Sequence, residues 1–186
     1  MTSRLLCQAW RMTWPTAPTL HTARFALEPL AVQHAEQMVD VLAAPDLYLF
    51  TGGEPPTLDG LRAQYSRQSA GHSPANDAGW LNWIVRASDP GTAIGYIQAT
   101  LTLEDGALIA SMAWLITPAA QGVGAAAEVA LAATTWLQTQ HVADFRALIH
   151  PDHVASEHVA RHLGLQPTPR TVDGETVWQT VGGTPA

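Results

Sequence analysis

The chain has 186 residues, of which 47% are hydrophobic, and this composition indicates one globular domain that buries a full core. Its net charge of −7 argues against a nucleic-acid partner, because neutralising phosphates requires a basic stripe and none is visible. All nine basic residues are arginines. The absence of lysine excludes Schiff-base enzymes, pyridoxal-phosphate enzymes and P-loop nucleotidases, which each need an amine at one fixed place.

The N-terminal segment predicts neither export nor membrane insertion. Its apolar patch is broken by Arg11 after a few residues, too soon for a signal peptide or a bilayer span. Cys7 is the only cysteine, so an intramolecular disulfide and a thiolate zinc cluster are excluded and a reducing cytoplasm is expected. We expect residues 1–20 to form a peripheral extension, 21–182 a single domain and 183–186 a tail.

The first half of the domain reads as a strand and two helices. Residues 23–30 alternate as a strand does, and 31–44 carry apolar residues at helical spacing until Pro45 stops the helix. After a turn-rich loop, Thr57 is placed to cap a second helix over 58–70. Both helices therefore precede the main run of strands.

Three extended segments follow and predict an antiparallel meander. Residues 80–88, 92–103 and 107–117 are rich in aromatic or β-branched side chains, and the short turn signals DPG and EDG separate them. The remaining pattern predicts a helix at about 123–140, a strand at 145–150, a helix at 153–164, and short strands around 165–170 and 176–181.

The glycines after the third strand admit two ligand-binding interpretations. Gly122, Gly124 and Ala127 fit the G-x-G-x-x-A pattern of dinucleotide-binding folds. Four residues separate the strand from the first glycine, however, and that strand belongs to an antiparallel meander. Only 62 residues (125–186) follow Gly124, too few for the remaining parallel strands and helices. A dinucleotide-dependent oxidoreductase therefore stands as the weaker interpretation.

The same stretch also fits the pattern Q-x-x-G-x-A through Gln121, Gly124 and Ala126. A glycine here lets the backbone approach a pyrophosphate, and the N–H groups at the start of the following helix point toward it. The plain alternative is a glycine-containing helix start that binds nothing.

Two further blocks accompany this motif. The order of elements resembles the GNAT superfamily of acyl-CoA-dependent N-acyltransferases, and HPDHVASEHVARHLGLQP (150–167) resembles its C-terminal segment. TARFALEPLAVQHAEQM (22–38) resembles the subgroup that includes the ribosomal-protein N-terminal alanine acetyltransferases. The elements and the resemblance together imply an α/β (α+β) domain with a mixed, mostly antiparallel sheet of six or seven strands flanked by helices.

The resemblance implies a coenzyme site for acetyl-CoA. The strand end would lie beside the pantetheine and thioester, and the glycine loop would offer backbone N–H groups to the pyrophosphate. The start of the helix at 153–164 would contact the sulfur end. The residues so assigned are Leu115, Ile116, Thr117, Gln121, Gly122, Val123, Gly124, Ala125, Ala126, His153 and Ser156. The chain departs from the family pattern at His153, at Leu165, and at Ser111, where many subgroup members have a glutamate.

The implied reaction is direct attack of an amine on the thioester in a ternary complex, with no covalent enzyme intermediate. A backbone N–H near Ile116 is a candidate oxyanion donor, and Ser156 is a candidate donor to the leaving thiolate. Glu54, His150 and Asp152 are candidate general bases. Asp152 equally suits a helix cap, and a water could replace all three.

No metal is expected, because the pair His158 and His162 has no third ligand in register. The acceptor is an amine-bearing small molecule, such as a polyamine, an aminoglycoside or an amino-acid-like compound, or a peptide N-terminus. No nucleic acid and no membrane is expected as a partner, and the oligomeric state is open between monomer and homodimer. A non-catalytic acyl-CoA sensor is the alternative function, because Ser111 removes one usual base.

The acceptor pocket is expected between the two N-terminal helices and the loop LFTGGEPPT (49–57), with Trp80 and the C-terminal strands on the other side. A flexible glycine pair followed by a stiff proline pair can hold Glu54 at the edge of such a pocket. The other tryptophans of the strands and the long helix are expected in the core: Trp83, Trp114 and Trp136.

Overall fold

The computed structural model describes residues 13–89 and 91–181. The expected tail at 183–186 and the first twelve residues of the expected extension lie outside them. The strands are β1 (Leu20–His21), β2 (Phe25–Pro29), β3 (Gly79–Ala87), β4 (Ala93–Glu104), β5 (Ala107–Ile116), β6 (Val142–Ile149), β7 (Leu165–Val172) and β8 (Glu175–Thr180). The helices are α1 (Ala35–Val41), α2 (Leu58–Gln68), α3 (Ala125–Thr139) and α4 (Val154–His162), with 3-10 turns η1 (Val32–His34), η2 (Pro45–Tyr48) and η3 (Pro118–Ala120).

The eight strands form one sheet in the order β1-β2-β3-β4-β5-β6-β8-β7, in which only the β5–β6 pair is parallel. The predicted mixed, mostly antiparallel α/β arrangement is confirmed, although the sheet has one strand more than the six or seven expected. The additional strand is β1, whose Leu20 and His21 pair with β2. It is too short for an alternating pattern to reveal it.

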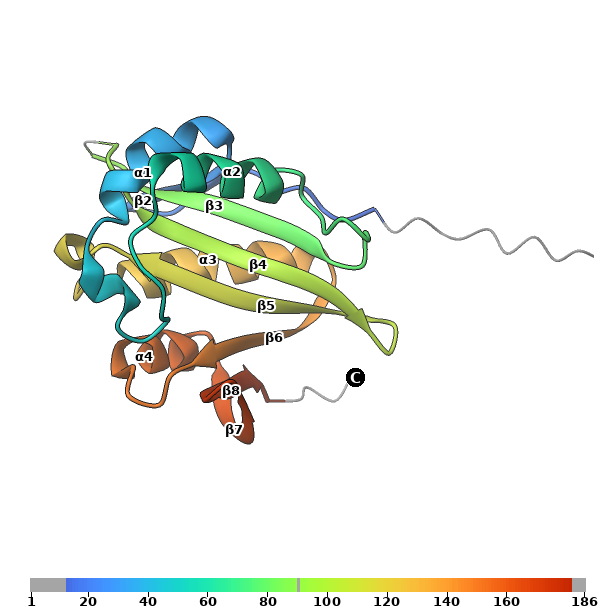
Figure 1. Ribbon diagram of the computed structural model, residues 1–186. Coiled ribbons are helices and arrows are strands. Elements are labelled where there is room, and N and C mark those ends of the chain that lie inside the picture. Colours follow the sequence, from blue (N-terminus) through green and yellow to red (C-terminus); the bar gives the residue numbers. More distant parts are fainter. Residues whose placement is uncertain (1–12, 90, 182–186) are drawn as a thin grey trace, which may run out of the picture.

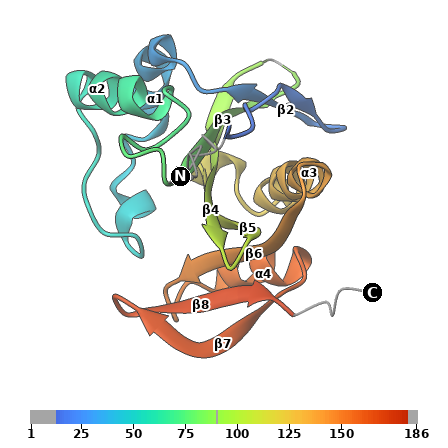
Figure 2. The same cartoon turned by 90° about the vertical axis from the view of Figure 1, so that its right-hand side faces the viewer.

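The helices cover the two faces of the sheet separately (Figures 1 and 2). Helices α1 and α2 pack over β3 and β4 on one face, whereas α3 and α4 lie on the other. Successive residues of a strand point to opposite faces of the sheet, so β3 contributes side chains to both hydrophobic clusters. Trp83 lies in the core beneath α3, and its neighbour Ile84 lies in the cluster beneath α1 and α2. Trp136 of α3 meets Trp83 edge to face at 5.9 Å.

Residues 13–19 lie against the domain. The ring of Trp14 packs so closely on Gly79 at the start of β3 that a Cβ added there would come within 2.7 Å of it. The indole Nε1 of the fully buried Trp83 donates to the carbonyl of Pro18 at 2.7 Å. This part of the chain, for which the sequence predicts only a peripheral extension, therefore satisfies a core tryptophan.

All four predicted helices are shorter than their sequence patterns, and two of the differences have a local cause. The pattern over 31–44 resolves into η1 and α1, because the ring nitrogen Nδ1 of His34 accepts from the Ala31 amide at 3.1 Å and holds a tight first turn. The long helix begins at Ala125 rather than 123, because Gly124 has φ 77° and cannot be its first helical residue. No helix among the described residues has the length and apolar character needed to cross a bilayer.

Strands β5 and β6 pair over a short stretch and then part. Their register covers Leu108–Ser111 of β5 only, after which the far edge of β6 pairs with β8. Figure 1 shows the two strands diverging toward their C-terminal ends. The last residues of β5, from Met112 to Ile116, thus keep one edge free of strand partners, and we call this opening the splay.

Gly95 of β4 is the residue against which the free part of β5 rests. A Cβ at this position would lie 2.0 Å from the carbonyl oxygen of Leu115 and 2.9 Å from the Cα of Ile116. Only glycine permits this approach, so β4 holds the β5 end in place where β6 has withdrawn.

We predict that Gly95→Ala destabilises the fold by about 3 kcal/mol, because backbone on two strands must shift to admit one methyl group. Gly106→Ala, in the turn at the other end of the same hairpin, meets no atom within 4 Å and adds only the cost of its positive φ, about 1 kcal/mol. Urea unfolding of both variants measures the difference. Equal losses would show that the β4–β5 approach imposes no special constraint.

Candidate active site

The loop between β5 and α3 leads into a helix start whose first N–H groups have no partner within the helix. Gly122 and Gly124 have φ of 78° and 77°, which turn the chain tightly into the helix. The first α-helical bond joins the Glu128 amide to the Gly124 carbonyl at 3.1 Å, so the amides at 125–127 have no acceptor within the helix. The side chain of Val123 is 57% exposed, which leaves the loop open to solvent. An anion can bind here, where the positive end of the helix dipole lies.

Arg24, from the turn between β1 and β2, ties this loop to the sheet. Its Nε lies 2.7 Å and its Nη2 2.5 Å from a carboxylate oxygen of Glu128, and its Nη1 donates to the Val123 carbonyl at 2.9 Å. Burial acts to raise the pKa of Glu128, but hydrogen bonds from Thr22 and Arg24 and the arginine charge outweigh it and lower that pKa. The carboxylate therefore stays charged and compensated beside the anion site.

Arg24 has no predicted role. The one feature of the sequence that draws attention to Arg24 is its place in the block 22–38, because its partner Glu128 is 104 residues away. The Arg24 guanidinium lies near Gly124, but the Glu128 carboxylate balances its charge, so the attraction of the loop for an anion rests on the amides and the helix dipole.

The end of β5 is locked to the same loop. The Nε2 of Gln121 donates to the Ile116 carbonyl at 2.7 Å, and the Thr117 amide donates to the Ile94 carbonyl at 2.8 Å. Because an antiparallel ladder alternates its bonding direction, the Thr117 and Leu115 amides face β4. The Ile116 and Trp114 amides then face the splay, so the predicted oxyanion donor near Ile116 points into the opening.

Helix α4 brings Ser156 to the splay. The indole Nε1 of Trp114 donates to the Ser156 hydroxyl oxygen at 3.3 Å, and Ser156 is 9% exposed. A hydroxyl that accepts through one lone pair keeps its own proton available for donation. The Trp114 side chain, expected in the core, packs only partly buried against it and bridges from β5 to α4.

His153 and His150 lie at the same end, beneath an aromatic ring. Phe50, which follows η2, stacks on His153 with ring centroids 4.4 Å apart and lies 5.6 Å from the ring of His150. Figure 1 shows the connection between η2 and α2 running from near α4 across the C-terminal end of β5. Burial, and secondarily the nearby His150, lower the pKa of His153, so its imidazole is neutral at pH 7.

The geometry weakens two of the candidate bases. The Nδ1 of His150 accepts from the Asp152 amide at 3.2 Å, so in its neutral form the proton sits on Nε2 and no lone pair is left for an incoming amine. Asp152 is 83% exposed in its side chain. Helix α4 starts with His153 as its N-cap and has no side-chain cap bond, so the expectation that Asp152 caps it is wrong.

Glu54 lies apart from this histidine pair, at a small cavity on the α1–α2 face. The cavity has a volume of about 160 Å³ and we call it the inner cavity. Besides Glu54, its polar lining is Tyr48, Gln64, Tyr65, Gln68, Asn82, Tyr96 and Gln98. Tyr96 and Gln98 pair directly with Leu115 and Ala113 of β5, so the cavity lies one strand away from the splay.

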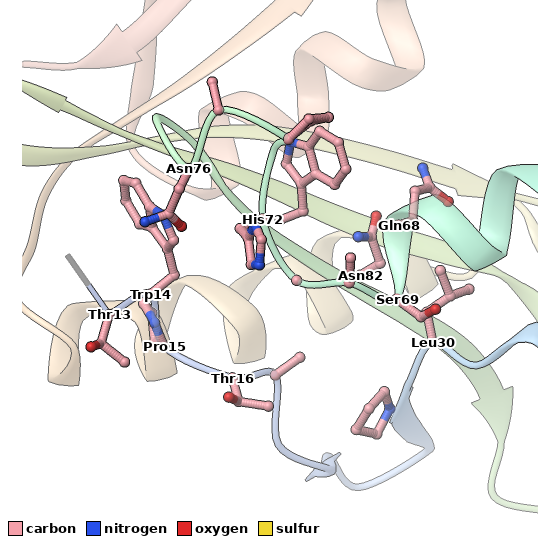
Figure 3. Close-up of a pocket in the computed structure, with 17 residues that line it drawn as sticks. Thr13, Trp14, Pro15, Thr16, Leu30, Gln68, Ser69, His72, Asn76 and Asn82 are labelled. Carbon is pink, nitrogen blue, oxygen red and sulfur yellow. The ribbon is translucent and has the colours of Figure 1, made fainter. Parts of the chain in front are cut away.

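Two larger cavities continue from the inner one. The middle cavity, about 370 Å³, lies between α2 and β4, and the outer cavity, about 920 Å³, lies between the N-terminal segment and the turn before β3. Gln68 and Asn82 line all three, and Figure 3 shows their side chains beside each other at the edge of the outer cavity. Trp80 lines the middle and outer cavities, whereas no described residue of β7 or β8 lines any of the three.

The predicted residues fall into two groups in the structure, which we call the coenzyme half and the acceptor half after the roles that the sequence resemblance implies. The coenzyme half contains the β5 end, the glycine loop and the start of α4, and the acceptor half contains Glu54 and Trp80. Phe50 joins the two, and nothing in its turn-rich sequence indicates that contact. Within residues 13–89 and 91–181, no three His, Cys, Asp or Glu side chains are grouped so that they could hold a metal ion.

Several solved acetyltransferases share this fold. RimL, a ribosomal L7/L12 α-N-protein acetyltransferase solved with coenzyme A, superposes with a TM-score of 0.72 at 12% identity, over 88% of this chain and 98% of that one. An acetyltransferase from Agrobacterium tumefaciens gives 0.67 at 24% identity, over 92% and 98%. An aminoglycoside acetyltransferase solved with coenzyme A gives 0.68 at 18% identity, over 83% and 92%.

At these identities the structural likeness concerns the fold. A search of curated protein sequences gave no match. The model of the family described as "Acetyltransferase (GNAT) domain" matches residues 24–166, which is most of the chain. The chain therefore belongs to the GNAT acetyltransferase family.

Proposed function

We propose that this protein transfers the acetyl group of acetyl-CoA to a primary amine, by direct attack within a ternary complex. The observation that carries the proposal is the splay: β5 keeps a free edge from Met112 to Ile116, and this edge leads directly to the exposed amides of the glycine loop. Coenzyme A carries two amides and then a pyrophosphate. The amides can hydrogen-bond to the unpaired strand edge, and the pyrophosphate can bind at the helix N-terminus that follows it.

In this proposal the amine nitrogen attacks the thioester carbonyl from the α1–α2 side. Its lone pair forms the C–N bond, the carbonyl oxygen takes the negative charge, and a backbone N–H of Ile116 or Trp114 stabilises it. The C–S bond then breaks and the sulfur leaves as a thiolate, to which Ser156 donates a hydrogen bond. The ammonium proton passes to a base, either before attack or as the intermediate collapses.

Glu54 is the base that the arrangement favours. It is the carboxylate on the inner cavity, whereas His150 is constrained by the Asp152 amide and lies outside that cavity. Ser111, which occupies the position of the usual subgroup glutamate, is exposed on β5 where the β6 pairing ends. A sensor that binds the coenzyme without turning it over is the alternative function, and thiol release in the presence of an amine distinguishes the two.

We predict that Val123→Glu lowers the affinity for coenzyme A at least tenfold, because a carboxylate about 4–6 Å from a doubly charged pyrophosphate costs about 1.4 kcal/mol or more. Val123 is exposed, so the fold tolerates the change. Leu131→Glu adds the same charge at an exposed position of α3 away from the loop and should bind normally. Calorimetric titration with coenzyme A measures both, and equal binding by the two variants contradicts the proposed coenzyme site.

Ser156→Ala is expected to lower kcat by about tenfold to a hundredfold with little change in coenzyme affinity. The reason is that a hydrogen bond to a charged group is worth about 1.5–3 kcal/mol, and the thiolate charge develops only during reaction. Thiol release and coenzyme titration together measure the two effects. Wild-type turnover would leave Ser156 as an acceptor for Trp114 and nothing more.

Glu54→Gln is expected to reduce kcat/KM for the amine at least tenfold and to flatten the rise of the rate with pH, while coenzyme A still binds. Asp59→Asn, in the exposed first turn of α2, removes a nearby charge without touching the cavity and serves as the control. The rate of thiol release against amine concentration, measured from pH 6 to 9, provides the comparison. Unchanged kinetics in Glu54→Gln would exclude it as the base.

A further inference from the structure

Buried polar atoms without a partner gather around the acceptor cavities. Among the described residues, four buried side-chain atoms lack a hydrogen-bond partner, and three of them are Trp14 Nε1, Tyr65 Oη and Gln68 Oε1. All three residues line the cavities: Trp14 the outer one, Tyr65 the inner one and Gln68 every one. Buried polar groups without partners are uncommon in folded proteins, so such a concentration points to a missing ligand.

The inner cavity offers both donors and acceptors. Tyr65 is only 3% exposed, and burial, with a smaller contribution from Tyr96, raises its pKa well above the usual range, so its phenol keeps a proton to donate. The Nε2 of Gln98 donates to the Oδ1 of Asn82 at 2.9 Å, which directs the remaining Nδ2 of Asn82 elsewhere as a donor. Gln68 contributes an acceptor, its Oε1.

The charge lining is sparse. Glu54 is the only carboxylate among the described residues of the three cavities, and Arg67 and His72 are the only cationic or imidazole side chains. One carboxylate can pair one ammonium. A second ammonium inside the cavities would lose its hydration without a counter-charge. The free energy of that desolvation exceeds what a hydrogen bond to an amide contributes.

Taken with the proposed function, on which this step rests, we propose that the acceptor carries a single ammonium next to a neutral group that both donates and accepts hydrogen bonds, namely a carboxamide or a hydroxyl. Tyr65, Gln68 and Asn82 recognise this group and Glu54 receives the ammonium. The same lining disfavours polyamines and other polycations whose second ammonium would also lie inside the cavities. The cavities widen past Gln68 toward Trp14 and His72 (Figure 3), so the far end of a longer acceptor points outward.

The experiment compares four amines in the full-length protein with saturating acetyl-CoA. L-alaninamide carries the carboxamide, L-alaninol the hydroxyl, 3-methyl-2-butylamine an apolar group of similar shape, and spermidine the extra charges. We expect kcat/KM for the amide or the alcohol to exceed that for spermidine at least tenfold, and the better of the two identifies the recognised group. A preference for spermidine overturns the inference.

The variant Tyr65→Phe removes only the unpartnered hydroxyl. It is expected to lower kcat/KM for the preferred amine about tenfold and to leave 3-methyl-2-butylamine unchanged within twofold, a comparison from which amine basicity cancels. Its melting temperature without substrate should be equal or higher, because a buried unpartnered group disappears. Tyr48→Phe removes a hydroxyl that already donates to the Leu42 carbonyl, so it should affect both amines alike.

Gln68→Leu provides a second variant with the same expected selectivity. Equal effects of Tyr65→Phe and Gln68→Leu on the polar and apolar amines would overturn the inference, whatever their size. Failure of the proposed function gives a different pattern: coenzyme A does not bind to the unaltered protein, or none of the four amines releases thiol.

Discussion

The separation of β5 from β6 is the constraint on which the rest of the structure depends. Two parallel neighbours in a sheet normally share a full ladder, because unpaired strand edges leave N–H and C=O groups without partners. Here β6 turns to β8 after pairing with Leu108–Ser111, and β4 alone holds the end of β5. In the proposed function, a ligand with amide groups would supply partners to the N–H and C=O groups that this opening leaves unpaired.

Everything that the coenzyme would contact is attached to that opening. The end of β5 leads into the glycine loop, Gln121 fastens the two together, and Arg24 fastens the loop to the first strands. Helix α4 closes the other side through the Trp114–Ser156 contact. The acceptor half is built differently, because it is a polar hollow between a helix layer and a sheet face. Among the described residues, β4, β5 and the loop that carries Phe50 connect it to the coenzyme half.

Features with a local signal could be predicted from the sequence. Gly122 and Gly124 indicate the loop, because a tight turn into a helix needs residues with positive φ. The antiparallel meander is predicted by the alternating side chains and the two short turns between its strands. The family and the fold class are confirmed, while the assigned roles of Ser156, His150, Glu54 and the loop amides stay predictions. Ser156 and His153 could be identified only through resemblance.

Features that depend on distant partners could not be predicted. Arg24 meets Glu128 across 104 residues, and Phe50 finds His153 across a loop whose composition indicates only a turn. Tyr65 falls on the apolar phase of α2 and would be assigned to the core, where it does lie, but sequence does not reveal that its hydroxyl lacks a partner. Hydrogen-bond satisfaction is a property of the assembled fold.

The packing of Trp14 on Gly79 makes the N-terminal segment a wall of the outer cavity. A protease that cuts between this segment and β2 would remove that wall and the Pro18 carbonyl that Trp83 uses, yet leave the β5 end and the glycine loop whole. In the proposed function, such a cut would alter the acceptor cavities and leave the residues assigned to the coenzyme in place.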